Sequence, residues 1–461
     1  MVVQHNMQAA NANRMLNITS NAQAKSTEKL SSGYKINRAA DDAAGLSISE
    51  KMRKQIRGLD QASSNAEDGV SAVQTAEGAL TEVHSMLQRM NELAVQASNG
   101  TNSETDRSAI QDEISQLTTE IDRVAETTKF NETYLLKGDS STKKEYMSAH
   151  DAGLKGTLTD GATSATFEVA AGALDAGKSV TIGGKDYTIG ATAVEAKALL
   201  GTTYDGSVSA TINGTTYTLV ADGDEDKDAN KLKKSSIEAL VTAGATVEVG
   251  SKKATVITDQ DNDGVDDANS TVITAAKAID LMEAELKAAN SIGTTDGQVT
   301  MGTKPTYSST DGATFTINKG YAEVADKLSF SLHVGSDADM TNKITVDIET
   351  MNSSFLGIKG LNVNDDSGIA ATYAIDAISD ALQKVSEQRS SLGAVQNRLE
   401  HTIDNLDNVV ENTTSAESRI RDTDMAEEMV NYSKNNILQQ AGQSMLAQAN
   451  QSTQGVLSLL Q

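Results

Sequence analysis

Hydrophobic residues recur every seven positions along one long stretch of the chain, from Leu46 to Ala97. The repeat runs through Met52, Leu59, Ala66, Val73, Leu80, Leu87 and Ala94. A period of seven predicts a single long helix whose apolar seam must be covered by other helices. A second run of sevens lies far downstream, at Ile378, Val385, Leu392, Leu399 and Leu406. We therefore expect the two ends of the chain to pack against each other.

A third and shorter heptad run, from Ile110 to Val124, predicts another helix of the same bundle. We expect the long helix to end at Asn99-Gly100, because both residues tolerate a left-handed backbone. Ser103, with Asp106 three residues later, predicts a capping box that opens the next helix.

Other helix boundaries follow from the same kind of local signal. Breaks are expected at Gly33 and at Asp41–Gly45. Asp365, Asp366 and Ser367 offer N-caps for the downstream heptad helix, which we expect to end near Val410.

The first thirty residues and the segment after Met425 have helical patterns with few apolar residues. Such segments bury too little apolar area to offset the entropy of ordering, so we expect them to stay disordered until a partner covers them. A second copy of the chain is the natural partner, and head-to-tail contacts that do not close a ring give an open helical polymer. The residues expected to form this contact are Leu438, Met445, Val456, Leu457 and Leu460.

The middle of the chain changes to a period of two. Three similar units alternate apolar and polar residues around a Gly turn, at Val180–Ile189, Ala210–Leu219 and Val247–Val256. This pattern predicts β-hairpins, each followed by a loop and a helical run. The sequence therefore predicts an α+β fold in which both chain ends form a discontinuous antiparallel helical bundle, or coiled coil, around a β-rich insert of ββα repeats.

Composition removes several classes of function. The 461 residues include five His and no Cys, and the absence of Cys excludes thiol chemistry. The formal net charge is −25, which disfavours binding to the negatively charged phosphates of nucleic acid. The histidines lack metal-ligand spacing and there is no Gly-x-Ser-x-Gly or H-E-x-x-H motif, so we do not expect an enzyme. No apolar run is long enough to span a membrane, and the N-terminus lacks the features of a cleaved secretory signal.

Two motifs in the insert resemble ligand sites. Gly172–Ser179 matches the phosphate-loop pattern, but a hairpin strand is expected where the phosphate-binding helix would start, so we interpret the match as chance. Asp259, Asp261, Asp263 and Asp267 surround a Gly turn and could gather oxygens on a calcium ion. A solvated acidic turn is the alternative, because Ser270 occupies the position where an EF-hand loop has Glu. No other cofactor is expected.

Residues at both ends of the chain resemble the conserved regions of bacterial flagellin. At the N-terminal end these are Leu30–Gly33, Asp41–Gly45, Gln74–Leu80, Glu92–Gln96 and Glu120–Val124; at the C-terminal end they are Ser391–Arg398, Ile437–Gly442, Leu446–Asn450 and Val456–Leu460. The resemblance covers about half of the chain. Tyr34-Lys35 and the terminal Gln461 depart from residues common in the family.

The resemblance implies the subunit of the flagellar filament, a structural protein used in motility. The inner tube of the filament would be formed by residues 1–40 with 419–461. The outer tube would be formed by residues 41–140 with 365–418, as a three-helix bundle with a hairpin. The surface-exposed insert, with one or two subdomains, would be residues 141–364. It implies export through the flagellar type III channel without a cleaved signal peptide, and an extracellular location.

The resemblance also implies partners. These are other copies of the chain in a helical filament, an export chaperone, and hook-associated and cap proteins. Neither nucleic acid nor a membrane is expected as a partner. The patch sensed by the flagellin-specific Toll-like receptor would map onto Gln88, Arg89, Leu93 and Glu113, which could equally contact neighbouring subunits. The alternative function is a hook-filament junction protein of the same superfamily.

Overall fold

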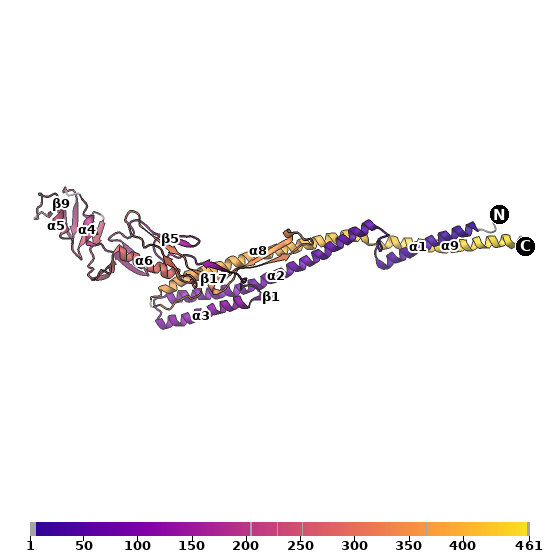
Figure 1. The fold of residues 1–461 in the computed structure, drawn as a ribbon, viewed down its shortest axis with the longest axis horizontal. Coiled ribbons are helices and arrows are strands. Elements are labelled where there is room, and N and C mark those ends of the chain that lie inside the picture. The colour runs from indigo at the N-terminus through magenta and orange to yellow at the C-terminus, as the bar shows by residue number, and fades with distance from the viewer. Residues whose placement is uncertain (1–5, 203–204, 228, 251, 366, 459–461) are drawn as a thin grey trace. The chain divides into compact units, whose positions relative to one another are not determined.

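The computed structural model describes residues 6–202, 205–227, 229–250, 252–365 and 367–458. The helices are α1 (Met7–Ser32), α2 (Ala43–Ser98), α3 (Glu104–Thr127), α4 (Ala193–Leu199), α5 (Lys234–Glu238), α6 (Ala275–Asn290), α7 (Ser353–Leu356), α8 (Ile369–Arg421) and α9 (Met425–Ser458), with a 3₁₀ turn at Met340–Asn342. Long helices come from both ends of the chain, and the strands come from the stretch of sequence between α3 and α8 (Figure 1). The predicted α+β class is confirmed.

The chain forms two compact units. The first contains the described residues of 1–71, 331–346 and 395–461, and the second contains those of 72–330 and 347–394. Helices α2 and α8 each contribute one segment to each unit.

The heptad stripes form the seam that their spacing predicts. In the second unit, the side chains of Val73, Leu80 and Leu87 on α2 are fully buried, as are those of Val385 and Leu392 on α8 and Ile121 on α3. In the first unit, Ala66 of α2 and Leu399 of α8 share a small core with Ile344. Burial of each large aliphatic side chain contributes about 1.5–3 kcal/mol, so the seam is the main source of stability of the helical part.

Two helix boundaries differ from the prediction. Helix α2 begins at Ala43, so the break before it is confined to the preceding residues and Gly45 lies inside the helix, where its amide donates to Asp42 Oδ1 at 2.9 Å. Helix α8 continues past Val410 to Arg421. The extension lacks an apolar stripe, but it contains no Gly or Pro, and Glu417 accepts a hydrogen bond from Ser49 of α2 at 2.9 Å.

The end of α2 is also built differently from the prediction. Gly33 ends α1 with a positive φ of 75°, as expected, and the capping box of Ser103 and Asp106 opens α3. Neither Asn99 nor Gly100 has a positive φ, so a left-handed termination of α2 is wrong.

Arg107 of α3 instead occupies the end of α2. Its guanidinium donates to the carbonyl oxygens of Ala97 at 2.9 Å and Asn99 at 3.4 Å, and to that of Asp365 at 3.0 Å. The residue is only 3% exposed. One buried cation therefore satisfies carbonyl oxygens at the end of α2 and in the segment that leads into α8. In that segment Asp365 and Ser367 supply two of the predicted caps of α8, and Asp366 lies outside the described residues.

The strands form several small sheets. Their bounds are β1 (Lys129–Phe130), β2 (Thr133–Tyr134), β3 (Thr142–Tyr146), β4 (Thr157–Asp160), β5 (Ser164–Val169), β6 (Ser179–Ile182), β7 (Lys185–Ile189), β8 (Ser209–Ile212), β9 (Thr215–Val220), β10 (Lys231–Lys233), β11 (Thr246–Val249), β12 (Lys252–Thr255), β13 (Val265–Asp266), β14 (Asn269–Ile273), β15 (Thr300–Met301), β16 (Ala313–Asn318), β17 (Tyr321–Ala325), β18 (Leu328–His333) and β19 (Lys343–Ile348). The three predicted hairpins are confirmed as the antiparallel pairs β6–β7, β8–β9 and β11–β12.

The larger sheets enclose two cores in the insert. Strand orders are β10-β9-β8-β11-β12, β13-β14-β7-β6 and β15-β16-β5-β4. One core contains the buried rings of Phe167 and Phe315, which lie opposite each other on β5 and β16, together with one face of α6. The other contains Leu219 and Val247 and is covered by α4 and α5. Smaller two-stranded sheets pair β1 with β2, β3 with β17, and β18 with β19.

The Arg107 contact gives a stability prediction. Replacing Arg107 with Ala leaves buried carbonyl oxygens without donors, so we expect the free energy of unfolding to fall by about 2–4 kcal/mol. Urea unfolding followed by far-ultraviolet circular dichroism measures this change. Arg123→Ala is the control on the same helix, because Arg123 forms an exposed ion pair with Glu120 and should cost less than about 0.5 kcal/mol. Equal losses in the two variants would contradict the role of Arg107.

Candidate assembly and binding surfaces

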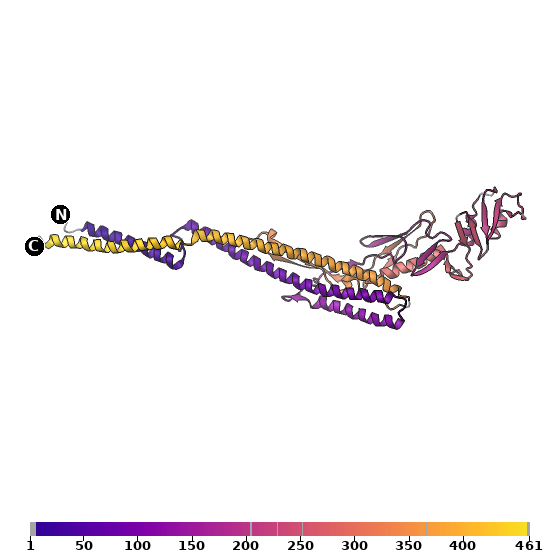
Figure 2. The ribbon, with the colours of Figure 1, turned by 180° about the vertical axis from the view of Figure 1, so that it is seen from behind.

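Helices α1 and α9 lie side by side and run antiparallel (Figures 1 and 2). Asn6 Nδ2 donates to the carbonyl of Ala449 at 3.2 Å, and Lys29 Nζ lies 3.8 Å from Glu428 Oε2 at the other end of the pair. The loops between the helices are tied together as well, because the amide of Thr423 donates to the carbonyl of Gly33 at 2.9 Å. The two termini of the chain therefore belong to one structural element.

This pair of helices contains almost no buried side chains. Ser26 is the only buried residue of α1, and no residue of α9 whose burial is described is buried. Large apolar side chains point into solvent instead. On α1 these are Met7, Met15 and Ile18, and on α9 they are Met425, Met429, Val430, Ile437, Leu438 and Met445.

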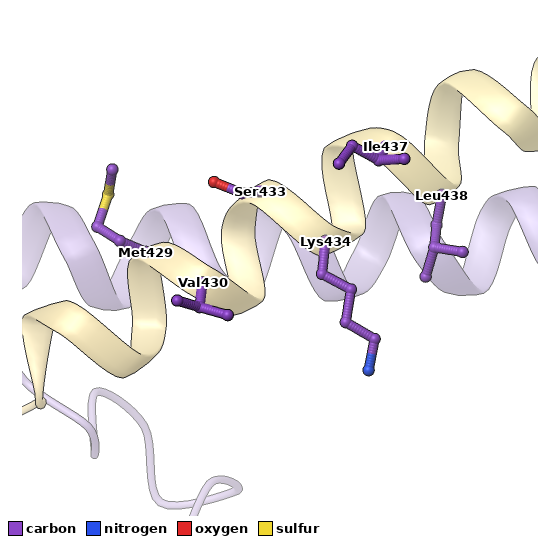
Figure 3. Close-up of a pocket in the computed structure, with 6 residues that line it drawn as sticks. All are labelled: Met429, Val430, Ser433, Lys434, Ile437 and Leu438. Carbon is purple, nitrogen blue, oxygen red and sulfur yellow. The ribbon is translucent and has the colours of Figure 1, made fainter.

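The surface of α9 forms a shallow apolar hollow (Figure 3). It is lined by Met429, Val430, Ser433, Lys434, Ile437 and Leu438. Lys434 is the only charged residue between Met429 and Ser452. A surface that is helical, apolar and nearly free of charge exposes hydrophobic area that water does not solvate well, which is typical of an interaction surface.

The structure exposes two of the residues predicted to form the polymer contact. Leu438 is 47% exposed and Met445 63% exposed. Val456 and Leu457 belong to α9, but their side chains lie outside the part of the chain that is described, as does Leu460 altogether.

The predicted receptor patch lies on α2 and α3. Arg89 Nε donates to Glu113 Oε1 at 2.9 Å, and Arg89 also pairs with Glu92 at 3.1 Å. Hydrogen bonding to Glu113, and then to Glu92, raises the pKa of the guanidinium. Gln88 is exposed beside this pair. The ion pairs hold Arg89 in one orientation while leaving it half exposed to a partner.

Leu93 does not share this surface. Its side chain is 2% exposed and belongs to the bundle core, so the structure does not expose it together with Gln88, Arg89 and Glu113. The C-terminal part of α2 is flanked by both α3 and α8 (Figure 2). The buried side of α2 there is therefore wider than the heptad seam between two helices. It includes Met90, Leu93, Ala94 and Ala97.

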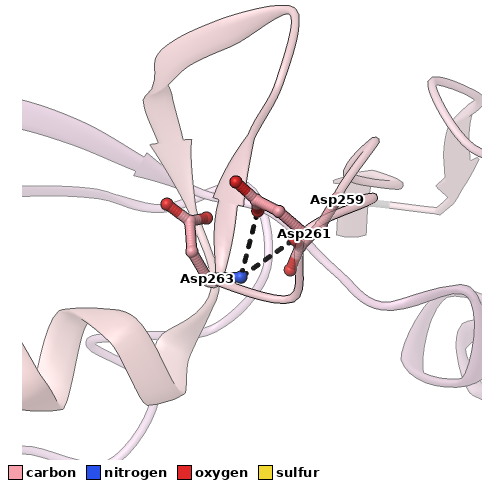
Figure 4. A group of neighbouring side chains, drawn as sticks. All are labelled: Asp259, Asp261 and Asp263. Carbon is pink, nitrogen blue, oxygen red and sulfur yellow. Dashed lines mark hydrogen bonds between the residues drawn. The ribbon is translucent and has the colours of Figure 1, made fainter.

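The acidic loop brings three of its four predicted residues together (Figure 4). One carboxylate oxygen each from Asp259, Asp261 and Asp263 lies within 4.8 Å of the others. Asp267 is not in that group, and its carboxylate accepts from the amide of Gln260 at 2.9 Å.

Backbone amides donate to carboxylate oxygens of the acidic loop. The amide of Asp263 donates to Asp259 Oδ1 at 3.1 Å and to Asp261 Oδ1 at 3.2 Å, while that of Gly264 donates to Asp259 Oδ2 at 3.0 Å. These bonds close the turn without a cation, which favours the solvated acidic turn. Calcium binding stays a prediction.

Sequence reasoning missed the residue that holds this loop in place. Asp266 is buried and accepts hydrogen bonds from the amides of Thr258, Ala268 and Asn269 at 2.8–3.0 Å. A single buried Asp among neighbouring Asp residues that are partly or fully exposed carries no distinguishing signal in the sequence.

The phosphate-loop match has the geometry of a hairpin. Strand β6 begins at Ser179, where a phosphate loop would start its helix. The amide of Gly177, which such a loop would offer to phosphate, donates to the carbonyl of Ile189 at 2.7 Å. The expected strand is confirmed. Among the described residues, no helix is long and apolar enough to cross a membrane.

Comparison with known proteins identifies the family. Residues 3–141 match the model of the bacterial flagellin N-terminal helical region, and residues 375–460 match that of the C-terminal helical region. A flagellin of Clostridium tyrobutyricum is 42% identical over 458 residues, which cover 98% of this chain and 100% of the relative. A flagellin of Halalkalibacterium halodurans is 35% identical over 460 residues, with 100% of both chains covered.

A solved structure of FliC from Burkholderia pseudomallei is 22% identical, with a TM-score of 0.28 over 72% of this chain and 99% of that one. The full-length curated relatives and the two family models decide the assignment. The chain therefore belongs to the bacterial flagellin family and is a structural, non-enzymatic subunit of the flagellar filament.

Proposed function

We propose that this chain polymerises through α1 and α9, whose apolar faces become buried between neighbouring copies. The observation that carries the proposal is the set of large apolar side chains that α1 and α9 expose to solvent, such as Val430 at 68% and Ile437 at 67%. Full burial of a side chain of this size contributes about 1.5–3 kcal/mol. Several such contacts per subunit can outweigh the entropy lost on ordering and association.

The same observation explains why the isolated helices need a partner. A helix pair with no buried apolar core gains little from folding alone, because long helices in water depend on packing rather than on propensity. We infer that α1 and α9 are stably ordered only in the polymer. Assembly and ordering of the termini would then be one process.

The apolar contact gives an assembly prediction. Leu438→Glu with Met445→Glu places charges in the proposed interface, so we expect elongation from filament seeds to slow by at least tenfold while circular dichroism of the monomer is unchanged. Light scattering and electron microscopy measure elongation. The matched control, Leu438→Met with Met445→Leu, keeps the surface apolar and should elongate normally. Normal elongation of the Glu variant would contradict the proposal.

The hook-filament junction function remains the alternative. A junction protein would join or cap a polymer without propagating it. Purified wild-type chain that binds seeds but never lengthens them would favour this alternative. The identity of more than 40% to a full-length flagellin favours the filament subunit.

We also propose that the surface around Arg89 is recognised by the flagellin-sensing Toll-like receptor. Its support is the family resemblance, together with the exposure of Gln88, Arg89 and Glu113 and the ion pairs that preorganise Arg89. Leu93 would contribute by packing beneath this surface rather than by direct contact.

Receptor recognition gives a cellular prediction. An Arg89→Ala monomer should stimulate receptor-bearing cells at least tenfold less than the wild type, because a central Arg is lost from the interface. Reporter-gene activity against monomer concentration measures the difference. Arg123→Ala removes another exposed Arg of the bundle and is the control. Stimulation unchanged by Arg89→Ala would remove the receptor proposal.

The remaining partners rest on family resemblance alone. We infer an export chaperone, hook-associated and cap proteins, and export without a cleaved signal peptide. The absence of Cys and the single Pro are compatible with passage of an unfolded chain through a narrow channel.

A further inference from the structure

The insert contains a cleft of about 610 Å³ at the boundary between its two hydrophobic cores. Leu174 and Ile189 line it from the core around Phe167, and Leu199 lines it from the core around Val247. The volume lies within the range of pockets that bind small molecules, and boundaries between domains are common places for such pockets. The cleft is therefore a candidate binding site in a part of the chain to which no activity has been given.

Closely packed backbone joins the two cores beside the cleft. The amide of Ala191 donates to the carbonyl of Thr255 at 2.8 Å, and the amide of Ile257 donates to the carbonyl of Ala191 at 3.0 Å. Gly177 has a φ of 83°, and a Cβ atom there would clash with the carbonyl oxygen of Lys253. Only Gly allows the two segments to approach so closely. The walls of the cleft are thus held together by hydrogen bonds and by backbone contact.

Three lysines on the walls of the cleft have no anionic partner. Lys178, Lys252 and Lys253 are exposed, and none of them forms an ion pair with a described residue. The chain has a net charge of −25, so three unpaired cations around one cleft are a local exception. A cleft lined by charges of one sign concentrates ions of the opposite sign. The lysines therefore favour an anionic ligand.

The carboxylates of the cleft bind neutral donors instead of these lysines. Asp175 Oδ1 accepts from the hydroxyl of Tyr307 at 2.9 Å and from that of Ser309 at 2.7 Å. Glu195 Oε2 accepts from the amide of Thr192 at 2.8 Å, as part of the capping box of α4. The positive charge of the lysines stays available to a ligand, and the Asp175 group adds hydroxyls that can donate and accept hydrogen bonds.

The lining offers the three kinds of contact that an acidic sugar can make. Ammonium groups of the lysines attract carboxylate or sulfate groups. The cluster of Asp175, Tyr307 and Ser309 can exchange hydrogen bonds with sugar hydroxyls. Ala198 and Leu199 offer apolar surface to the C–H faces of sugar rings.

A nucleotide fits the cleft less well, although the segment that matches the phosphate-loop pattern lies in its wall. The amide of Gly177 is already bonded to the carbonyl of Ile189, and strand β6 follows where a phosphate-binding helix would begin. The backbone amides that hold phosphates in such loops are therefore not presented to the cleft.

We propose that the cleft binds an acidic oligosaccharide, whose charged groups lie on Lys178, Lys252 and Lys253. This activity goes beyond the structural role of the chain. It does not depend on the proposed polymerisation, because no described residue of α1 or α9 lines the cleft.

The test measures binding of three tetrasaccharides to the full-length monomer by isothermal titration calorimetry at low salt, where charge interactions are least screened. The probes are a hyaluronan tetrasaccharide with carboxylates, a chondroitin sulfate tetrasaccharide with carboxylates and sulfates, and a neutral tetramer of N-acetylglucosamine. We expect at least one acidic probe to bind at least tenfold more tightly than the neutral one, and the two acidic probes distinguish a carboxylate site from one that needs sulfate. Binding of neither acidic probe, equal binding of the neutral one, or equally tight binding of inorganic sulfate overturns the inference.

Two variants test the walls of the cleft. Lys178→Gln with Lys252→Gln and Lys253→Gln removes the charges, whereas Ala198→Phe keeps the charges and fills the cleft. We expect each variant to bind the better acidic probe at least tenfold more weakly than the wild type, with unchanged circular dichroism. Affinity equal to that of the wild type in either variant contradicts the proposed site.

Matched controls separate the cleft from the net charge and from the added ring. Lys155→Gln with Lys185→Gln and Lys231→Gln removes the same charge from exposed positions of the insert outside the cleft. Val194→Phe places the same ring at an exposed position of α4 that does not line the cleft. Both controls should bind the acidic probe as the wild type does. A control that weakens binding as much as its paired variant overturns the inference.

Discussion

Burial of the α2 heptad stripe is the interaction on which the rest of the structure depends. Residues such as Leu80 and Leu87 have no water contact only because α3 and α8 lie over them. Since α8 begins far downstream in the sequence, this burial brings the two ends of the chain together and turns everything between them into an insert. The pairing also places α1 next to α9, because both leave the same end of the α2–α8 pair.

The helical bundle, the terminal helix pair and the insert differ in how their apolar side chains are covered. The α2, α3 and α8 seam is complete within one copy and holds a single subunit together. The α1 and α9 pair leaves large apolar side chains in solvent, and we propose that it gains its stability by association. The insert has two hydrophobic cores, one around Phe167, which also includes Tyr373 of α8, and one around Val247.

Much of this arrangement follows from the sequence, because heptad spacing and hairpin alternation are local signals. The burial of Leu392 and Ile121 and the turns of the three hairpins were predictable for that reason. Arg107 was not, since its acceptors Ala97 and Asp365 come from segments that only the folded chain brings together. The pairing of β5 with β16 is equally non-local. The burial of Leu93 did not follow from the heptad pattern, because a two-helix seam is narrower than the buried sector of a helix flanked by two others.

Hydrogen exchange with mass spectrometry, compared between monomer and polymer, tests the central claim most directly. The account predicts that amides of α2, α3 and α8 are protected in both states, whereas those of α1 and α9 exchange rapidly in the monomer and become protected in the polymer. Protection of α1 and α9 in the monomer equal to that of α2, or no gain in their protection on polymerisation, would contradict it.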